Sequence, residues 1–457
     1  MDKLREECGV FGFYNNDDFV TSEMIFSGLY ALQHRGQESA GIAIYNGEQI
    51  NYHKALGLVG NIFNENILSE LKGECGVGHV KYAQAEKITV ENAQPIVSNY
   101  INGGLAVTHN GNIGNVKEVK HKLEEEGFIF QTTTATEVIS ALIAKNSVKN
   151  TDIGEAITKV MQTVKGAYAL AMLSENKLIA ARDPLGIRPL CIGKIKNSYI
   201  VASESVAIDS IGGEFIRDVL PGEIVIIDKT EIKSIQAIDA KKSALCIFEY
   251  IYFARPDSIM DGASVYNARL KAGILLAEEC EIDADIVIGV PDSGITAAIG
   301  YSIGSGIPYV EGFIKNRYVG RTFIQPSQFM REKSVMLKLN PIVDNIKGRR
   351  VIMVDDSLVR GTTSKKIVAM LRRAGAKEVH FLLASPPIIY GCHYGINTPQ
   401  RQNLIASVKS LAEIKEMLGV DTLHYISEES LVKSVENINI NLCTACANGN
   451  YPISIEE

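Results

Sequence analysis

Short apolar segments, in which hydrophobic and small residues alternate with polar ones, dominate the first half of the chain. Segments of this kind that are bounded by Gly and Asn are typical of strands. They predict strands at 8–14, 39–45, 103–110, 167–173, 177–183, 199–204 and 223–228. Longer patterns at 21–34 and 136–146 predict helices. The first half is therefore expected to form stacked sheets with helices between or outside them, an α+β arrangement.

The pattern changes from about residue 245 onward. Apolar runs within 284–294 and 349–364 each end in Asp, continue into Gly, Ser or Thr, and are followed by a helical pattern. This order is typical of parallel strands that lead into phosphate-binding loops of an α/β fold. The polar stretch 228–243 is a plausible junction, so we expect one domain over 8–235 and a second over 236–457.

Length and composition agree with this division. The 457 residues exceed one ordinary core, and two domains of roughly 200 residues each are the natural expectation. A net charge of −7 gives no sign of a nucleic-acid partner. No apolar run approaches the roughly 20 residues of a membrane span, and the first residues lack the apolar stretch of a secretory signal. We therefore expect a cytoplasmic enzyme, whose eight cysteines are metal ligands or catalytic thiols rather than disulfides.

The stretch 351–364 carries the clearest chemistry. An apolar strand ends at Asp355 and Asp356, and a loop of small hydroxyl residues around Gly361 leads into a helix. The start of that helix would give a phosphate backbone N–H groups, together with the hydroxyls of 362–364. The two carboxylates suit sugar hydroxyls or a divalent metal instead. The pattern predicts a phosphorylated sugar as ligand, with an ordinary capped strand–helix loop as the alternative.

This stretch resembles the phosphoribosyl-pyrophosphate (PRPP) loop of type I phosphoribosyltransferases. The resemblance implies that the acidic pair contacts the ribose and the loop holds the 5′-phosphate. Residues 289–302 look like the matching pyrophosphate segment, with Ser293 near a magnesium ion. Residues 311–326 look like a basic lid that closes over pyrophosphate, which we favour over the alternative of a solvated loop. The implied PRPP-binding residues are Lys315, Arg317, Arg321, Lys338, Asp355, Asp356, Arg360, Gly361, Thr362, Thr363 and Ser364, and the implied Mg²⁺ ligands are Ser293, Asp355 and Asp356.

Three further stretches, "CIFEYIYFARPDS", "EGFIKNRYVGRTFIQP" and "MLKLNPIV", extend the resemblance to one family over almost the whole chain. The chain is similar to amidophosphoribosyltransferases (glutamine PRPP amidotransferases). This implies an N-terminal nucleophile glutaminase domain followed by a phosphoribosyltransferase domain. The implied reaction transfers amide-derived ammonia to PRPP and gives 5-phosphoribosylamine, pyrophosphate and glutamate, the first step of purine synthesis.

The resemblance also gives Cys8 a role. It implies that residues 1–7 are a propeptide whose removal makes Cys8 the N-terminal nucleophile, with Asn110 and Gly111 as the oxyanion hole. A terminal amine, which titrates near 8, can then act as base for the thiol. The stretches "LQHRGQESAGIAIY" (32–45) and "HNGNIGN" (109–115) support this assignment. The alternative is a buried structural cysteine at the start of a strand.

Cys443 and Cys446 form a C-x-x-C motif, which alone fits zinc, redox and iron–sulfur sites. Cys246 and Cys392 stand at the positions of two further ligands in the iron–sulfur branch of the family. The resemblance implies a [4Fe–4S] cluster of structural function, and zinc remains the rival because four cysteines also fit it. Gly391 stands where the family usually has proline.

The predicted glutamine pocket departs from the family. Residues 78–86 read "GHVKYAQAE" where the family has "GHxRYSTAG", so Lys81 replaces the arginine that holds the α-carboxylate. In 132–138 Ala135 replaces the aspartate that holds the α-ammonium. Lysine loses the forked geometry of arginine, and alanine removes an anion. Two alternatives follow: a divergent paralogue that uses free ammonia or another amide donor, and a PRPP-sensing regulator. The family further implies a homo-tetramer that purine nucleotides inhibit.

Overall fold

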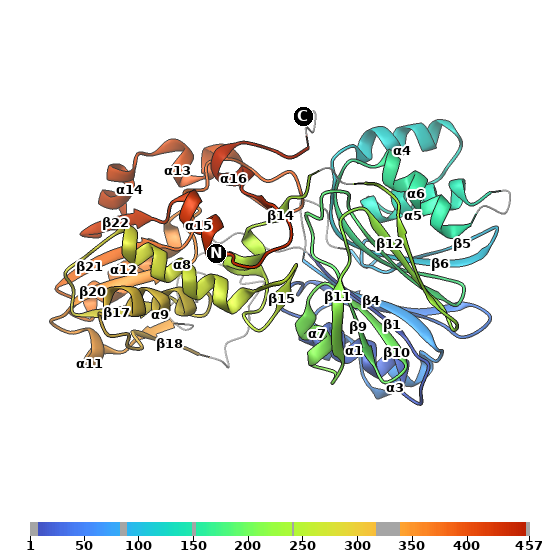
Figure 1. Cartoon of the computed structure of the whole chain (residues 1–457), viewed down its shortest axis with the longest axis horizontal. Helices are drawn as coiled ribbons and strands as arrows, with labels where there is room; N and C mark the ends of the chain where they lie inside the picture. Colours follow the sequence, from blue (N-terminus) through green and yellow to red (C-terminus); the bar gives the residue numbers. More distant parts are fainter. Residues whose placement is uncertain (1–7, 83–88, 149–151, 240–241, 317–338, 454–457) are drawn as a thin grey trace.

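In the computed structural model, the two halves of the chain lie side by side (Figure 1). The described residues are 8–82, 89–148, 152–239, 242–316 and 339–453. Within these ranges no helix combines the length and the apolar character needed to span a bilayer.

Two antiparallel sheets form the N-terminal half. The first has the strand order β11-β9-β10-β1-β4-β2-β3 and the second β13-β12-β8-β7-β6-β5. The strands of the first sheet are β1 Cys8–Tyr14, β2 Ser39–Tyr45, β3 Ile50–Leu56, β4 Cys75–Lys81, β9 Cys191–Ile195, β10 Ser198–Ala202 and β11 Glu214–Asp218. Those of the second are β5 Ile96–Tyr100, β6 Gly103–Ile113, β7 Gly166–Ser174, β8 Lys177–Arg182, β12 Glu223–Ile227 and β13 Ile232–Gln236.

Alternation along β1 shows why the sheets stack. Val10 and Tyr14 pack in the core between the two sheets, whereas Phe11 and Phe13 pack on the opposite face against α1, because successive side chains of a strand point to opposite faces. At Gly12 a Cβ would lie 2.5 Å from Leu178 Cδ1 of the second sheet. A larger residue at position 12 would therefore displace the Leu178 side chain of the facing sheet.

Helices cover both outer faces and give four layers. The core beneath α1 and α7 lies on the first sheet, and the core beneath α4, α5 and α6 lies on the second. The helices of this half are α1 Thr21–Ala31, α2 Val59–Ile62, α3 Glu65–Glu70, α4 Val116–Glu125, α5 Ala135–Asn146, α6 Ile153–Thr163 and α7 Ser205–Asp209.

The C-terminal half is built on a parallel sheet with the order β17-β20-β21-β22. On β20, Ile352 and Val354 enter the core that includes α8 and α9, while Val351 and Met353 enter the core that includes α12 and α14. Both faces are thus covered, which explains the uninterrupted apolar run in the sequence. The α/β fold expected for this half, after an α+β half of stacked sheets, is confirmed.

The elements of this half include several short ones outside the main sheet. Its strands are β14 Leu245–Cys246, β15 Ile259–Met260, β16 Ala263–Ser264, β17 Ile286–Gly289, β18 Phe313–Lys315, β19 Leu339–Pro341, β20 Arg350–Asp355, β21 Glu378–Leu383, β22 Thr422–Tyr425 and β23 Leu442–Cys443. Its helices are α8 Val265–Glu279, α9 Gly294–Ser305, α11 Val343–Ile346, α12 Thr362–Arg373, α13 Ile405–Val408, α14 Leu411–Leu418, α15 Glu428–Ser434 and α16 Ala445–Asn448, with a π-helix, η1, at Glu249–Phe253 and a 3-10 turn, η2, at Arg401–Asn403.

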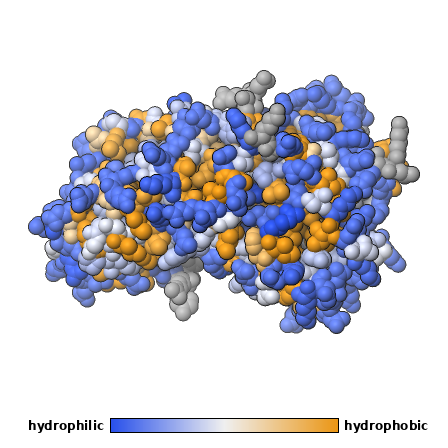
Figure 2. All heavy atoms as spheres, in the orientation of Figure 1, coloured by the Kyte–Doolittle hydropathy of each residue, from blue (hydrophilic) through white to orange (hydrophobic). Residues whose placement is uncertain are grey.

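Buried polar contacts join the halves. Arg182 at the end of β8 forms a forked pair with Asp261, with N–O distances of 2.9 and 2.8 Å. Asn112 of β6 donates from Nδ2 to the carbonyl of His393 at 2.9 Å. In the face shown in Figure 2, hydrophilic residues cover most of the area, and hydrophobic ones appear as separate patches on both halves and between them. The sites described below lie in both halves and near this junction.

Candidate functional site

Cys8 lies in a pocket at the end of the first sheet. It begins β1, is 4% exposed, and is opposite Lys81 in the antiparallel register of β1 and β4. Both residues line the pocket, together with parts of β6 and the start of α5. The other lining residues are Tyr82, Gln94, His109, Gly111, Asn112, Thr134, Ala135 and Thr136. The structure therefore brings together three residues that the sequence assigned to amide chemistry: Cys8, Lys81 and Gly111.

The predicted oxyanion pair lies on β6 beside this pocket. Asn110 is fully buried, and within the described part of the chain its side-chain amide has no hydrogen-bond partner at either atom. A buried amide in that state costs free energy unless a ligand satisfies it. Gly111 has φ 138°, and a Cβ there would lie 2.0 Å from the carbonyl oxygen of Ala167. Only glycine fits at this position, and the neighbouring amide suits a developing oxyanion.

Two buried histidines, His79 on β4 and His109 on β6 itself, make contacts that involve the backbone of β6. His79 on β4 contacts the carbonyl of His109 through Nε2 at 3.1 Å. The backbone N–H of His109 donates to Gln94 Oε1 at 2.7 Å. Burial lowers the pKa of His79 to about 3 and that of His109 to about 4. Both rings are therefore neutral at physiological pH, and they hold the strand that carries Asn110.

Lys81 and Ala135 mark the departures in the pocket. Lys81 donates from Nζ to the carbonyl of Asn92 at 3.2 Å. Ala135 is the first residue of α5, whose N-cap Thr134 accepts from the N–H of Glu137 at 3.3 Å. The described lining residues thus include one cationic side chain and no carboxylate. Ala135 lies at the wall of the pocket that also contains Cys8 and Lys81.

In the other half, Asp355 is the last residue of β20 and Asp356 follows it, as predicted; they are 2% and 1% exposed. Asp356 accepts hydrogen bonds from the hydroxyl of Ser357, at 2.6 Å, and from that of Ser293. Ser293 and Asp356 line one cavity with Arg269 and Tyr250. Of the three residues that the sequence assigned to one magnesium site, the structure brings Ser293 and Asp356 into contact, whereas Asp355 is not among the residues that line this cavity.

The loop after the acidic pair leads into α12. Gly361 is the N-cap residue, with φ 80°, and a Cβ there would lie 2.9 Å from Met417 Cε. Thr362, Thr363 and Ser364 form the first turn of α12, Ser364 is buried, and Arg360 is exposed. The backbone N–H groups of this first turn form the anion-binding end of the helix.

The predicted basic segment is described only in part. Lys315 ends β18 and forms an ion pair with Asp292. Arg317, Arg321 and Lys338 lie outside the described residues.

The four cysteines assigned to a cluster line one pocket, although they come from distant parts of the sequence. Cys246 and Cys443 are paired residues of the parallel strands β14 and β23, and Cys392 and Cys446 complete the set. Burial raises the pKa of Cys443 to about 11. Among the described residues, no three His, Cys, Asp or Glu side chains are arranged as ligands around a metal ion. The remaining cysteines, Cys75, Cys191 and Cys280, lie elsewhere.

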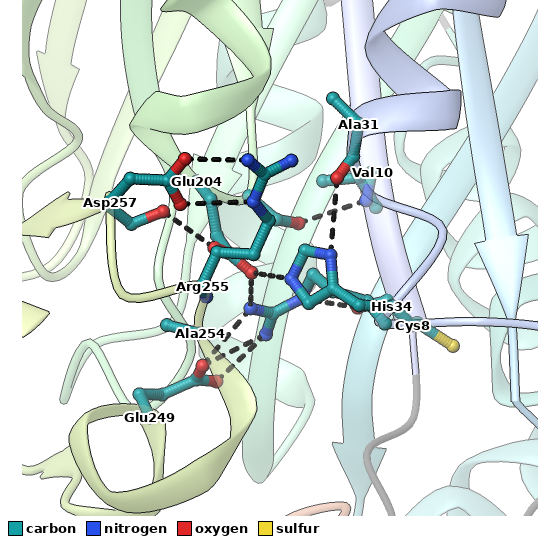
Figure 3. Close-up of polar contacts among 12 residues, drawn as sticks. Cys8, Val10, Ala31, His34, Glu204, Glu249, Ala254, Arg255 and Asp257 are labelled. Atoms are coloured by element: carbon teal, nitrogen blue, oxygen red, sulfur yellow. Dashed lines mark hydrogen bonds and ion pairs between the residues drawn. The ribbon is translucent and has the colours of Figure 1, made fainter. Parts of the chain in front are cut away.

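Sequence reasoning missed the charged residues behind Cys8. Four fully buried charged side chains form ion pairs with one another: Arg35, Arg188, Glu204 and Glu249. Figure 3 shows this region, with Glu204 and Glu249 labelled. A signal was present: Glu249 is a lone acid within the apolar run "CIFEYIYF". A charge in such a run is rarely buried without a partner, but the sequence does not reveal that partner.

Comparisons with known proteins agree with the division into halves. A glutamine amidotransferase domain matches residues 83–210, and a phosphoribosyl transferase domain matches residues 264–384. The chain is 48% identical to the amidophosphoribosyltransferase of Archaeoglobus fulgidus over 98% of each chain. It is 46% identical to that of Bacillus subtilis over 99% of this chain and 95% of the other.

Solved structures show the same relationship. The glutamine PRPP amidotransferase of B. subtilis in complex with ADP and GMP has a TM-score of 0.91, at 46% identity over 98% of each chain. A structure described as the allosteric regulatory enzyme of purine biosynthesis has a TM-score of 0.92, at 46% identity over 98% of this chain and 97% of the other.

Fold, pockets and matches together define a two-domain enzyme in which an amidotransferase half precedes a phosphoribosyltransferase half. More specifically, the chain belongs to the amidophosphoribosyltransferase family, which places it among the pentosyltransferases of purine biosynthesis.

Proposed function

We propose that this enzyme transfers ammonia from the amide of glutamine to PRPP, giving 5-phosphoribosylamine, pyrophosphate and glutamate. One observation carries the proposal. A single chain holds Cys8 in one pocket with Lys81 and Gly111 in one half, and an acidic pair followed by a helix N-terminus in the other. The first arrangement suits amide cleavage and the second suits a sugar phosphate.

In the N-terminal half, Cys8 Sγ attacks the amide carbon, and a thioester forms as ammonia leaves. The Asn110 amide and the backbone at Gly111 stabilise the oxyanion of the tetrahedral intermediate. Lys81 is placed to attract the α-carboxylate of glutamine. Water then hydrolyses the thioester, which releases glutamate and restores the thiol.

The base for this step requires a new chain end. Cys8 joins residues 1–7 through a peptide bond, and an amide nitrogen is not basic. We propose that residues 1–7 are removed as a propeptide, so that the α-amine of Cys8 takes the thiol proton. The mass of the intact purified protein tests this proposal: it should lack residues 1–7, and a full-length mass in active enzyme would contradict it.

In the C-terminal half, ammonia attacks C1 of the ribose and pyrophosphate leaves. Asp355 and Asp356 hold the ribose hydroxyls, and the segment from Arg360 to Ser364 holds the 5′-phosphate. Lys315, with Arg317, Arg321 and Lys338, would attend the pyrophosphate. The buried carboxylates and Ser293 offer the oxygen ligands that Mg²⁺ requires. This ion would neutralise charge on the pyrophosphate.

The cysteine pocket supports a thiolate-bound metal centre by the residue types that line it. Four cysteines line one pocket together with Arg188, and soft sulfur ligands select iron–sulfur clusters or zinc. We propose a [4Fe–4S] cluster held by Cys246, Cys392, Cys443 and Cys446, with zinc as the rival. Its contribution would be structural, because it ties the C-terminal segment to the domain junction.

Regulation and assembly follow from the relatives. The B. subtilis structure holds ADP and GMP, so we propose that purine nucleotides inhibit this enzyme. We also propose a homo-oligomer, which large exposed side chains such as Tyr266 on α8 and Ile303 on α9 support. None of the eight cysteines, all of which the structure describes, forms a disulfide; this suits a reducing compartment, and we propose that the enzyme is cytoplasmic.

Replacing the nucleophile tests the division of labour between the halves. Cys8→Ala should abolish glutamine-dependent formation of pyrophosphate from PRPP, because no thioester can form. Turnover supported by ammonium chloride should continue, because the transferase half is untouched. Loss of both activities in a folded variant would contradict the proposal. Glutamine-dependent turnover in this variant would show that Cys8 is not the nucleophile.

A further inference from the structure

The wall of the amide pocket includes part of an irregular segment, residues 91–95, which is neither helix nor strand and leads into β5. The segment contributes Gln94, which lines the pocket and is 4% exposed. The Oε1 of Gln94 accepts from the N–H of His109 at 2.7 Å, and its Nε2 donates to the carbonyl of the same residue at 3.4 Å. The segment is therefore joined to β6 at the residue just before Asn110.

The same segment reaches two other walls of the pocket through Asn92. The carbonyl of Asn92 accepts from Lys81 Nζ of β4 at 3.2 Å. Its side chain pairs with Thr133: Nδ2 donates to the hydroxyl at 3.0 Å, and Oδ1 accepts from the N–H at 3.2 Å. The next residue, Thr134, is the N-cap of α5 and lines the pocket. Segment 91–95 thus connects β4, β6 and α5, so its position affects the shape of the pocket.

Backbone carbonyls of an irregular segment need hydrogen-bond donors from elsewhere in the protein. Lys54 supplies such donors to three of them. Its Nζ donates to the carbonyls of Ala93 at 2.6 Å, Glu91 at 3.2 Å and Pro95 at 3.4 Å. An ammonium group carries three N–H donors, so its donors equal these acceptors in number. One side chain therefore holds the segment at both of its ends and near its middle.

The location of Lys54 explains how one lysine can reach all three carbonyls. Lys54 lies on β3, the edge strand of the first sheet, opposite Gly41 of β2. A Cβ at Gly41 would lie 2.3 Å from the carbonyl oxygen of Gln94, so the segment crosses this face of the sheet in direct contact with β2. Lys54 is partly buried there, and burial lowers its pKa. Charge-assisted hydrogen bonds to the carbonyls offset the cost of taking the ammonium out of water.

We propose that Lys54 is a positioning residue for amide cleavage: its ammonium fixes segment 91–95, and through Gln94 it fixes the strand that carries the proposed oxyanion residues. This inference rests on the proposed function. A misplacement of about 1 Å in an active site can cost about a hundredfold in rate. Because the oxyanion develops only in the transition state, the loss should appear in kcat and leave KM nearly unchanged.

Two substitutions separate the charge of Lys54 from its length. Lys54→Met keeps a long unbranched side chain but removes the three donors. Lys54→Arg keeps the charge, but the planar fork of arginine directs its donors differently from an ammonium, so we expect a smaller loss. Lys194→Met is the matched control. Lys194 lies on β9, toward the other edge of the same sheet, where its Nζ lies 3.4 Å from Glu214 Oε2.

The experiment measures glutamine-dependent and ammonia-dependent formation of pyrophosphate, each over a range of donor concentrations. Lys54→Met should lower the glutamine kcat about ten- to hundredfold, with a nearly unchanged KM and with ammonia-dependent turnover retained. Lys54→Arg should recover part of the lost kcat, and Lys194→Met should match the wild type. A wild-type kcat in Lys54→Met, a rise in KM alone, or an equal loss of ammonia-dependent turnover would overturn the positioning role.

A double-mutant cycle tests whether Lys54 acts through Gln94. Gln94→Leu removes both hydrogen bonds to His109 and should also lower the glutamine kcat. If the lysine acts through this side chain, adding Lys54→Met to Gln94→Leu should cause little further loss. Additive losses would show that the two residues act separately, and would overturn the proposed route. If Lys54→Met does not fold, the same cycle with Lys54→Arg provides the test. A wild type without glutamine-dependent turnover would contradict the proposed function itself, whatever the variants do.

Discussion

In the proposed amide pocket, single residues would determine how glutamine is held. Lys81 supplies one positive charge, and Ala135 lies at the pocket wall on the first turn of α5. The start of a helix carries partial positive charge, which does not favour the α-ammonium of glutamine. A carboxylate at this position would complement both the helix and the substrate.

We therefore expect Ala135→Asp to lower the KM for glutamine about tenfold, since one charge-assisted hydrogen bond is worth about 1.4 kcal/mol or more. The kcat should change little, because the bond forms equally in the ground and transition states. Steady-state kinetics with saturating PRPP measure the effect. Ala135→Asn, which has the same shape but no charge, is the control. An equal gain from both variants would show that the charge is not responsible.

At the scale of elements, the two stacked sheets meet through buried histidines. His79 on β4 contacts the carbonyl of His109 on β6, and burial depresses the pKa of both rings. A histidine in the unfolded chain has a pKa of about 6.5. Below that pH the two histidines become protonated in the unfolded chain but stay neutral in the folded protein. Stability must therefore fall as the pH falls from about 6.5 toward the folded pKa values of about 3 and 4.

Each histidine should cost about 2 kcal/mol of stability between pH 7.5 and pH 5. We expect His79→Asn to reduce the drop in apparent Tm over this interval, as followed by differential scanning calorimetry. His121→Asn on α4 is the control, because the side chain of His121 is 73% exposed. An identical pH dependence in both variants and the wild type would contradict the assignment.

The sequence predicted some elements better than others. The segments 8–14 and 39–45 match β1 and β2 along their full length. Both faces of these strands are covered, one by the second sheet and the other by helices, so the apolar pattern continues through each strand. The helix predicted at 21–34 ends at Ala31 instead. Local patterns gave no prediction for β3, β5, β11 and β13, which lie at the sheet edges, nor for β4 and β9, which lie inside the first sheet. Edge strands have less need of an apolar pattern, since one side lacks a neighbouring strand.

Among the site residues, too, some groupings could be predicted from the sequence and others could not. Asp355, Asp356 and the loop to Ser364 are contiguous in sequence, so their grouping could be predicted. Arg35 and Glu249 are separated by more than two hundred positions and meet only through the domain junction. No periodicity connects such residues. The full set of contacts at Cys8 therefore required the structure.

At the scale of the whole molecule, the cysteine pocket connects the C-terminal segment to both halves. Arg188 of the N-terminal half lines this pocket and donates to the carbonyl of Tyr394 at 3.1 Å. β23 pairs with β14, so Cys443 carries the chain end back to the start of the second half. A metal centre here would hold the tail and the junction together.

We expect Cys443→Ser to remove the brown colour of a [4Fe–4S] protein, and to expose the segment after β22 to limited proteolysis, because one of four ligands is lost. Cys280→Ser, a change outside the pocket, should leave both properties intact. Visible absorbance, metal analysis and proteolytic fragment masses provide the measurement. Colourless wild-type protein that contains zinc would favour the rival metal, because four thiolates also satisfy tetrahedral zinc. Wild-type protein with neither metal, and with a protease-resistant tail in both variants, would show that packing and hydrogen bonds alone hold this segment in place.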